Sequence, residues 1–322
     1  MSLTIQTAKS LRGNEESLVQ FNIEHLKGKF LANEPLARYT TWRVGGIADY
    51  YFKPVDIEDL AMLLKQVPED MSVSWIGKGS NLLIRDGGIR GLVISLGAGF
   101  EQIQQLDSKR WLIGAGAACA RVAKSITAKG FKGAEFLIGI PGTIGGALAM
   151  NAGAYKGEMW QLVNSVKTVN KSGELFQRDK KDYEIAYRSV KGVKDEWFLA
   201  CELELEQYKE DESVIDLKEL LAKRSATQPL GQASCGSVFR NPENDFAARL
   251  IEESGLKGHR IGGAVVSEKH ANFIINNGDA SAKDIEDLIK YVQAEVQSNY
   301  GIKLFPEAKI FGEYANGVDG NE

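Results

Sequence analysis

The chain has 322 residues, 43% hydrophobic and 25% charged, which excludes a disordered chain or a fibre and predicts two or three folding units. Its net charge of −4, from 39 basic and 43 acidic side chains, gives no global field that would attract nucleic acid or a membrane surface, so neither partner is expected. The widely spaced cysteines and few histidines indicate reduced thiols and no metal site, and without a signal-like or membrane-length apolar segment the sequence predicts a cytoplasmic protein.

Residues 1–33 are polar and weakly periodic, and we predict that they form an N-terminal extension outside the main domains. A first α/β subdomain is predicted over residues 34–100. It contains strands at 48–53, 73–76 and 91–96, and a helix capped by Asp56 in which Ile57, Leu60, Leu63 and Leu64 share one face.

A second subdomain is predicted over residues 101–212, and a third domain over residues 213–312, because an acidic stretch separates them. The second contains a strand at 110–113, a helix at 117–129, and strands at 163–169, 174–178 and 197–205. The third contains a helix at 214–226 that Pro229 terminates, and a helix that begins at the capping box of Ser281 and Asp284 and ends near Gly301. Residues 313–322 are predicted to be a flexible tail.

Three glycine clusters interrupt these elements. Gly114 and Gly116 follow a strand and are spaced as in a dinucleotide-binding loop, but Cys119 stands where the third glycine is needed, so an ordinary turn is favoured. Residues 77–81 also follow a strand, and their N–H groups can converge on an anion, although alone such a segment is more often a simple turn. Residues 139–157 combine a bare-backbone turn with a helix start, where unpaired N–H groups favour phosphate oxygens. We predict that the last two loops cradle the diphosphate of a cofactor in an enzyme.

In their order along the chain, these segments resemble the UDP-N-acetylenolpyruvoylglucosamine reductase family. The resemblance covers about residues 34–312. Its motifs lie at residues 33–36, 39–46, 77–83, 139–155, 187–189, 235–242, 255–258, 266–267, 270–273 and 305–307. Their order is more specific than any one of them.

The resemblance implies an α+β fold, with a two-subdomain FAD-binding domain of the vanillyl-alcohol oxidase (PCMH) type and a smaller α+β substrate-binding domain. It implies non-covalent FAD, NADPH as hydride donor, and reduction of UDP-N-acetylglucosamine enolpyruvate to UDP-N-acetylmuramate in peptidoglycan precursor synthesis. The short stretch between Arg188 and Trp197 is similar to the class of this family without a tyrosine-loop insertion. A monomer is favoured.

The family pattern assigns catalysis to Arg188, Ser237 and Glu307. Arg188 and Glu307 would flank the substrate carboxylate and steady the developing enolate, and Ser237 would give a proton to the neighbouring carbon. Taken singly, each residue also has a plain structural explanation, as a surface ion pair, a turn hydroxyl or a solvated carboxylate.

The family pattern also implies binding residues. The cofactor-binding set is Gly77, Lys78, Gly79, Ser80, Asn81, Leu82, Gly139, Ile140, Pro141, Gly142, Thr143, Gly145, Gly146, Asn151, Gly153 and Ala154. The UDP part of the substrate needs cationic or polar partners in the third domain, for which the candidates are Arg224, Gln228, Asn241 and Lys257, and Tyr155 can reach the pyrophosphate or the flavin edge. Lys257 can equally complement a helix C-terminus, and Arg224 can lie on a solvated helix face. Cys235 is either a thiol nucleophile or, more simply, a small core residue. His270 and Asn272 are open between ligand contact and structural hydrogen bonding.

Other functions remain as alternatives. An oxidase of the same flavin fold is the nearest, but no histidine lies between His25 and His259, which excludes a histidyl flavin link in the FAD domain. A nicotinamide dehydrogenase that uses Gly114 and Gly116, and a non-catalytic nucleotide-sugar binding module, are the others.

Overall fold

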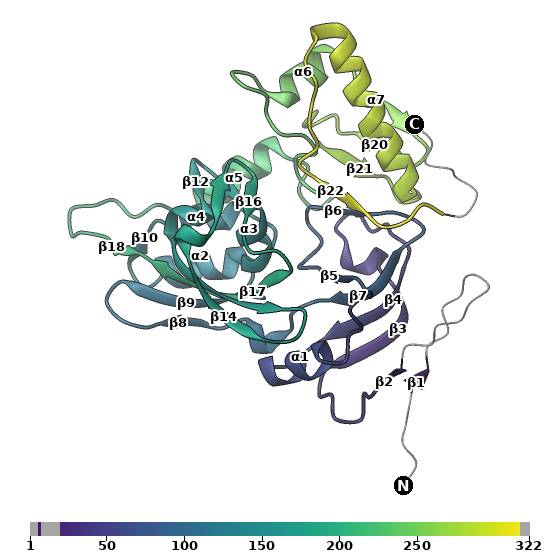
Figure 1. The fold of residues 1–322 in the computed structure, drawn as a ribbon. Helices are drawn as coiled ribbons and strands as arrows, with labels where there is room; N and C mark the ends of the chain where they lie inside the picture. The colour runs from purple at the N-terminus through teal and green to yellow at the C-terminus, as the bar shows by residue number, and fades with distance from the viewer. Residues whose placement is uncertain (1–5, 8–19, 316–322) are drawn as a thin grey trace. The chain divides into compact units, whose positions relative to one another are not determined.

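The computed structural model describes residues 6–7 and 20–315, and its helices and strands are mixed along the chain (Figure 1). The chain forms two compact units. Unit 1 comprises Met1–Asn33, Asp49–Gly77 and Gly91–Leu221, and unit 2 comprises Glu34–Ala48, Lys78–Arg90 and Ala222–Glu322. The predicted α+β class is confirmed, and each unit draws on more than one of the predicted domains.

Most of the first sheet belongs to unit 1. Its strand order is β3 (Lys29–Pro35), β4 (Ile47–Lys53), β7 (Ile89–Ile94) and β5 (Val73–Trp75), and β5 runs parallel to β7. Helix α1 (Ile57–Leu64) packs on this sheet through Leu60, Leu63 and Leu64, which share a core cluster with strand residues. Asp56 caps α1, because its side chain accepts the Asp59 N–H at 2.8 Å. The predicted strands, helix and cap are confirmed.

The end of the predicted extension packs with unit 1. Phe21 is 1% exposed and lies in the same core as α1. The Lys27 N–H donates to Asp59 Oδ1 at 2.8 Å, and β3 joins the first sheet. Short strands β1 (Gln6–Thr7) and β2 (Gln20–Phe21) pair antiparallel. Residues 20–33 are therefore part of unit 1, whereas residues 1–5 and 8–19 lie outside the described residues.

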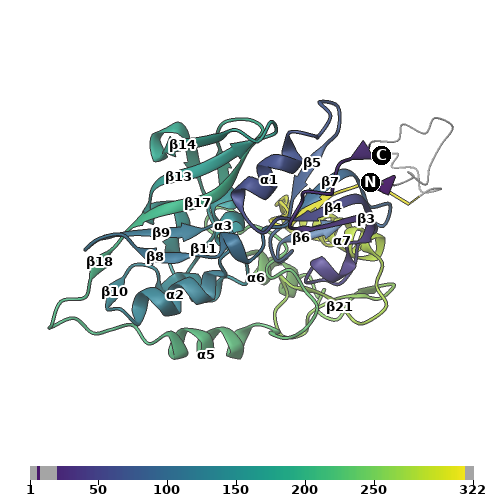
Figure 2. The same cartoon turned by 90° about the horizontal axis from the view of Figure 1, so that it is seen from below.

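The second sheet of unit 1 is wholly antiparallel. Its order is β14 (Leu175–Asp179), β13 (Val163–Asn170), β17 (Glu196–Glu204), β9 (Arg110–Gly114) and β8 (Ile103–Gln105). Figure 2 shows α2 (Cys119–Thr127) and α3 (Ile144–Met150) beside this sheet, and their apolar side chains share its core. The predicted strands and helix are confirmed.

The same sheet accounts for Gly114. A dinucleotide fold needs parallel strands around its first turn, but β9 pairs antiparallel with both of its neighbours. A Cβ atom at Gly114 would lie 2.1 Å from the Phe100 carbonyl oxygen, so packing alone requires this glycine. The ordinary strand-to-helix turn is the correct interpretation.

Shorter elements complete unit 1, and helix α5 (Leu217–Thr227) begins there and continues into unit 2. They are η2 (Ala98–Phe100), β10 (Phe131–Lys132), η3 (Glu135–Gly139), β11 (Gly153–Ala154), β12 (Gly157–Glu158), α4 (Met159–Leu162), η4 (Lys180–Asp182), β15 (Glu184–Ala186), β16 (Ser189–Lys191) and β18 (Glu206–Gln207). The β11–β12 and β15–β16 pairs are antiparallel hairpins.

Unit 2 is built around one long helix. Helix α7 (Ala282–Tyr300) begins at the predicted Ser281–Asp284 capping box and ends at Gly301, whose φ of +69° is left-handed. Its apolar face shares a core with α6 (Ala247–Glu253). The remaining elements are η1 (Ala37–Tyr39), an antiparallel sheet of β19 (Arg260–Ile261), β20 (Ala264–Val266) and β21 (Ile274–Asn276), and the parallel pair β6 (Leu82–Ile84) and β22 (Lys309–Phe311).

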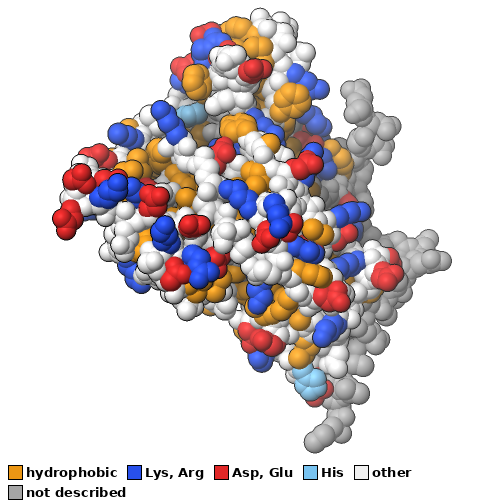
Figure 3. All heavy atoms as spheres, turned by 60° about the vertical axis from the view of Figure 1, so that its left-hand side comes forward, with side chains coloured by type: hydrophobic (Ala, Val, Ile, Leu, Met, Phe, Trp, Pro, Cys, Tyr) orange, Lys and Arg blue, Asp and Glu red, His pale blue; other side chains and the backbone are white. Residues whose placement is uncertain are grey.

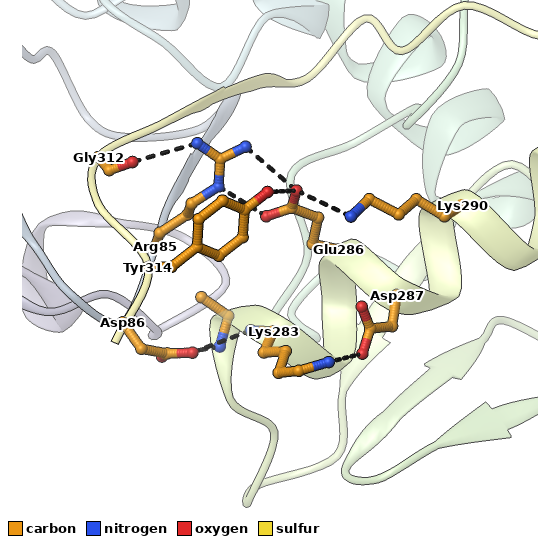
Figure 4. A network of polar contacts seen from close by, with 9 residues as sticks. Arg85, Asp86, Lys283, Glu286, Asp287, Lys290, Gly312 and Tyr314 are labelled. Atoms are coloured by element: carbon orange, nitrogen blue, oxygen red, sulfur yellow. Dashed lines mark hydrogen bonds and ion pairs between the residues drawn. The ribbon is translucent and has the colours of Figure 1, made fainter. Parts of the chain in front are cut away.

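A polar network fixes one end of the β6–β22 pair to α7 (Figure 4). Arg85 donates to both carboxylate oxygens of Glu286, at 2.8 and 3.1 Å, and to the Gly312 carbonyl at 3.1 Å. Tyr314 donates to Glu286 at 2.9 Å, and its ring lies 4.3 Å from the Arg85 guanidinium carbon. Burial raises the pKa of Glu286, but the hydrogen bonds and charges of Arg85, Tyr314 and Lys290 outweigh it, so the pKa lies below its usual value. The start of the predicted tail is thus held in place, and residues 316–322 lie outside the described residues.

The three cysteines are buried thiols, Cys119 and Cys201 in the core of unit 1 and Cys235 in that of unit 2. Burial raises the pKa of Cys201 and Cys235 well above the usual range. Figure 3 shows basic and acidic side chains interspersed on one face, as the small net charge predicts. Within residues 6–7 and 20–315, no helix is long and apolar enough to cross a bilayer, and no group of three or more His, Cys, Asp or Glu side chains is placed to hold a metal ion.

Candidate active site

The first predicted phosphate loop, residues 77–81, has open backbone donors. The N–H groups of Lys78, Gly79 and Ser80 donate to no acceptor within the part of the chain that the structure describes. Gly79 has φ +61°, and a Cβ atom there would lie 2.0 Å from the Tyr39 carbonyl oxygen, so only glycine fits. This loop has the properties of an anion cradle.

At the second predicted loop, the backbone donors at the start of α3 differ from the prediction. Thr143 caps α3 through a 3.4 Å bond from the Gly146 N–H. The N–H groups of Ile144 and Gly145 donate to the carbonyls of Ala117 and Ala115 at 2.9 and 2.8 Å. The first turn of α3 therefore does not present the unpaired donors expected from the sequence, because the segment before it pairs with residues 115–119 as a β-bridge.

The rest of the glycine run packs on its own aromatic side chain. A Cβ atom at Gly139 would lie 2.7 Å from the Tyr155 ring and 3.1 Å from the Ala154 Cβ atom. The Tyr155 hydroxyl donates to the Leu220 carbonyl at 2.7 Å, and Tyr155 has a left-handed φ of +49°. The structure thus brings Gly139, Ala154 and Tyr155 together in unit 1.

Arg188 lies in the turn of the β15–β16 hairpin and itself has φ +53°. Its Nη2 donates to the Gly153 carbonyl at 2.8 Å and its Nη1 to the Asn151 carbonyl at 3.4 Å. The guanidinium carbon lies 5.0 Å from the centre of the Tyr187 ring. The predicted catalytic arginine is therefore held by the segment that follows α3.

Ser237 and Glu307 lie on two segments of unit 2 that pair directly. The Glu307 N–H donates to the Val238 carbonyl at 2.7 Å, and Phe239 and Pro306 form a β-bridge. The Asn81 side chain donates to the Glu307 carbonyl at 3.1 Å. This pairing aligns the backbone around the predicted proton donor with that around the predicted carboxylate.

Asn272 braces the segment that carries Ser237. It is 4% exposed, its Oδ1 accepts the Phe239 N–H at 2.9 Å, and its Nδ2 donates to the Phe239 carbonyl at 2.8 Å. His270 accepts the Asn272 N–H at 3.3 Å, and burial lowers its pKa, so the imidazole is neutral near pH 7. Structural hydrogen bonding, one of the two roles left open for Asn272, accounts for its side-chain amide.

Two protein-family models and several curated reductases match this chain. The C-terminal domain of UDP-N-acetylenolpyruvoylglucosamine reductase matches residues 228–311, and an FAD binding domain matches residues 48–178. The UDP-N-acetylenolpyruvoylglucosamine reductase of Methylococcus capsulatus is 51% identical over 89% of this chain and 94% of its own length. That of Legionella pneumophila strain Corby is 49% identical over 91% of this chain and 95% of its own length. The chain belongs to this reductase family.

A solved structure agrees with the family. The crystal structure of UDP-N-acetylenolpyruvylglucosamine reductase from Thermus caldophilus is 31% identical, has a TM-score of 0.75, and covers 89% of this chain and 99% of that one. The expected FAD-binding domain is confirmed by the matching domain at residues 48–178. This reductase therefore binds FAD, and the open N–H groups of residues 78–80 fit a diphosphate.

Four of the five predicted substrate-binding residues lie in unit 2 and have partners there. Arg224 donates to Gln228 at 2.7 Å, the Asn241 side chain accepts the first N–H of α6 at 3.1 Å, and Lys257 pairs with Glu252 at 2.6 Å. A pocket of about 450 Å³ includes Gln228 but none of the other three. Arg260 and Lys269, which are not among the predicted residues, also line it. The sequence contains a signal that could have suggested Lys269, because this residue directly precedes the motif at residues 270–273.

Cys235 is the remaining chemical candidate near Ser237. Burial, and then the charge of Glu307, raise the pKa of its thiol well above the usual range, so it is not a thiolate nucleophile near pH 7. It is 4% exposed within the core of unit 2. The core interpretation of Cys235 is confirmed.

Proposed function

We propose that this chain reduces the enolpyruvyl ether of UDP-N-acetylglucosamine enolpyruvate to UDP-N-acetylmuramate, with NADPH as hydride donor and Arg188, Ser237 and Glu307 as the catalytic residues. The observation that carries the proposal is 51% identity, over 89% of the chain, to a reductase of that name. The backbone pairing of the Ser237 and Glu307 segments adds support, because it joins the two parts of the chain that carry these residues.

The reaction makes two demands on the protein. A hydride adds to the terminal carbon of the C=C bond, and a proton adds to the carbon that carries the ether oxygen and the carboxylate. FAD, when bound, supplies the two-electron carrier between NADPH and the substrate. Because negative charge spreads into the carboxylate during hydride addition, the protein has to supply fixed donors and one proton.

The three proposed residues divide this work. Arg188 carries a permanent charge that binds the carboxylate and stabilises the enolate-like charge. Glu307 assists as a protonated carboxyl that donates a hydrogen bond to the same group. The Oγ–H bond of Ser237 breaks as its proton moves to carbon, and a solvent-linked relay returns a proton to the oxygen. A hydroxyl is a weak acid, but an enolate is a base strong enough to accept its proton.

Different parts of the chain are proposed to bind the cofactor and the substrate. Residues 34–212 hold FAD, with the diphosphate at residues 77–82 and at the predicted residues of the run 139–154 other than Asn151. Residues 213–312 hold the substrate, with Arg224, Gln228, Asn241 and Lys257 toward the UDP part and Tyr155 contributed from the glycine run. We propose a cytoplasmic monomer that serves peptidoglycan synthesis. The domains matched at residues 48–178 and 228–311 support this division.

Separate half-reactions test the proposal. Ser237→Ala should leave flavin reduction by NADPH within about twofold, and should slow flavin reoxidation by the enolpyruvyl UDP-sugar by about 10²–10⁴-fold, the usual contribution of a general acid. Stopped-flow absorbance at the flavin band follows each half-reaction. Ser234→Ala, the same change three residues earlier, is the control and should alter neither rate.

Two outcomes would contradict the proposal. Equal slowing of both half-reactions in Ser237→Ala would remove Ser237 from the acid role. If the purified chain stays colourless after supplementation with FAD, or if the enolpyruvyl UDP-sugar does not reoxidise its reduced flavin, the whole function is wrong.

A further inference from the structure

Asn151 is the residue at which α3 ends. It is the C-cap of α3, has a left-handed φ of +46°, and is 1% exposed. Asparagine tolerates this backbone conformation better than most residues do. A buried amide at a helix end needs partners for its donor and acceptor atoms, since an unpaired one would cost about 1–3 kcal/mol.

All the partners of this amide are in unit 1. Nδ2 donates to Glu158 Oε2 at 2.9 Å and to the Ala186 carbonyl at 3.2 Å, and Oδ1 accepts the Trp160 N–H at 3.1 Å. The side chain thus joins the end of α3 to the start of α4 and to the last residue of β15. The side-chain amide, which the family pattern assigns to the cofactor, hydrogen-bonds to these protein atoms.

Two of the contacts of Asn151 lead to Arg188. Ala186, which accepts the Asn151 amide, lies two residues before Arg188 in the hairpin turn. The Asn151 carbonyl accepts Arg188 Nη1 at 3.4 Å, beside the 2.8 Å bond from Nη2 to the Gly153 carbonyl. One residue therefore contacts both the backbone that carries Arg188 and its guanidinium group.

The backbone of Arg188 needs such support. A non-glycine residue in the left-handed region costs about 1–2 kcal/mol, and it keeps that conformation only where its surroundings impose it. The space around the guanidinium is also restricted, because a Cβ atom at Gly153 would lie 3.1 Å from Arg188 Nη1. Small shifts of the α3 end would therefore move the charged group.

We propose that Asn151 is a positioning residue for Arg188, and that its buried amide sets where the guanidinium group meets the substrate carboxylate. This inference rests on the proposed role of Arg188 in substrate reduction. Misplacing a catalytic group by about 1 Å can cost about 10²-fold in rate, so loss of the amide should affect the step that uses Arg188.

Asn151→Gly tests the proposal, because glycine keeps the left-handed backbone and the carbonyl but removes the amide. We expect unchanged flavin content, NADPH reduction within about twofold, and reoxidation by the enolpyruvyl UDP-sugar slowed by about 10²-fold. Asn151→Asp is the second variant. It keeps the size of the side chain but points a carboxylate at Glu158 and the Ala186 carbonyl, so it should also slow reoxidation alone. Asn244→Gly, at another left-handed asparagine (φ +60°), is the control and should change neither rate.

A double-mutant cycle separates positioning from general loosening of the fold. Arg188→Ala alone should slow reoxidation at least as much as Asn151→Gly, and the double variant should be no slower than Arg188→Ala. If Arg188→Ala reoxidises at the wild-type rate, the proposed role of Arg188 fails, and this inference with it. If Arg188→Ala is slow but Asn151→Gly is not, or if the two effects multiply, Arg188 keeps its role and the positioning by Asn151 is overturned.

Discussion

The two units present their proposed catalytic side chains in opposite ways. In unit 1, Arg188 itself has a left-handed backbone, at φ +53°. In unit 2, the glycine that precedes Ser237 has it instead, because Gly236 lies at φ +82°. The strain in unit 1 falls on the functional residue, because a glycine cannot supply a guanidinium group. In unit 2, a glycine takes the unusual conformation and the serine does not have to.

The hydrogen bonds that hold Arg188 also differ in kind from those that hold the segments of Ser237 and Glu307. Arg188 is held by the carbonyls of Asn151 and Gly153, so its position depends on the backbone after α3. The segments of Ser237 and Glu307 are held by the buried amide of Asn272 and by the β6–β22 pair, which Arg85 and Glu286 fix at one end. The proposed catalytic segments of unit 2 are thus held by buried polar side chains, whereas Arg188 is held by backbone carbonyls. Variants of those side chains test this difference.

The largest effect is expected at Glu286, which is 5% exposed. Glu286→Gln removes a buried charge that Arg85 and Tyr314 pair with, and should lower the stability of unit 2 by about 3 kcal/mol at neutral pH. The pKa of Glu286 lies below its ordinary 4.5, so its stabilising effect is complete above that pH and is lost as the pH falls through the lower folded value. The gap between wild type and variant should therefore narrow below pH 4.5.

Hydrogen exchange measures this difference locally. Amides of α7 should lose protection in Glu286→Gln, while those of α3 should keep theirs. Equal loss of protection in both helices would break the comparison, because it would mean that the two units do not have separate sources of stability.

A smaller effect is expected at Asn272. Asn272→Ala leaves the buried N–H and carbonyl of Phe239 without their side-chain partners, so unit 2 should lose about 2 kcal/mol. Urea unfolding followed by tryptophan fluorescence gives the free energy of unfolding. A loss below about 0.5 kcal/mol would show that the Ser237 segment does not depend on this amide.

The smallest effect tests the contrast in backbone strain directly. Gly236→Ala should destabilise the protein by about 1 kcal/mol, although open space surrounds the position where the new Cβ atom would lie, because φ +82° disfavours it. Glycine should be favoured over alanine at the other site too, so Arg188→Gly should be about 1 kcal/mol more stable than Arg188→Ala. Calorimetric unfolding of the wild type and the three variants measures both differences, and an alanine as stable as glycine at either position would show that the left-handed backbone there carries no strain.

Local signals in the sequence account for much of the fold. The caps at Asp56 and Ser281, the helix end at Gly301 and the strands of the antiparallel sheet follow from short-range chemistry, and the structure confirms them. The first turn of α3 could not be predicted in the same way. Its N–H groups are taken by carbonyls of Ala115 and Ala117, about thirty residues away in the chain, and no local pattern encodes that pairing.

The candidate site shows the same limit. Residue type and order pointed to Arg188, Ser237 and Glu307, and a family resemblance was needed to connect them. The bracing roles of Asn151 and Asn272 were out of reach, because a lone asparagine in a sequence does not show whether its amide faces a ligand or a distant backbone group. Buried hydrogen bonding became visible only once the chain was folded.

The buried cysteines give each unit its own chemical probe of local unfolding. Cys119 and Cys201 lie in one core and Cys235 in the other, and in the folded state a raised pKa keeps the thiols of Cys201 and Cys235 unreactive toward alkylating reagents. Reaction at Cys235 therefore marks opening of unit 2, and reaction at Cys201 marks opening of unit 1. The rate of alkylation at each of these cysteines in the wild-type chain therefore measures how often its unit opens, without any introduced label.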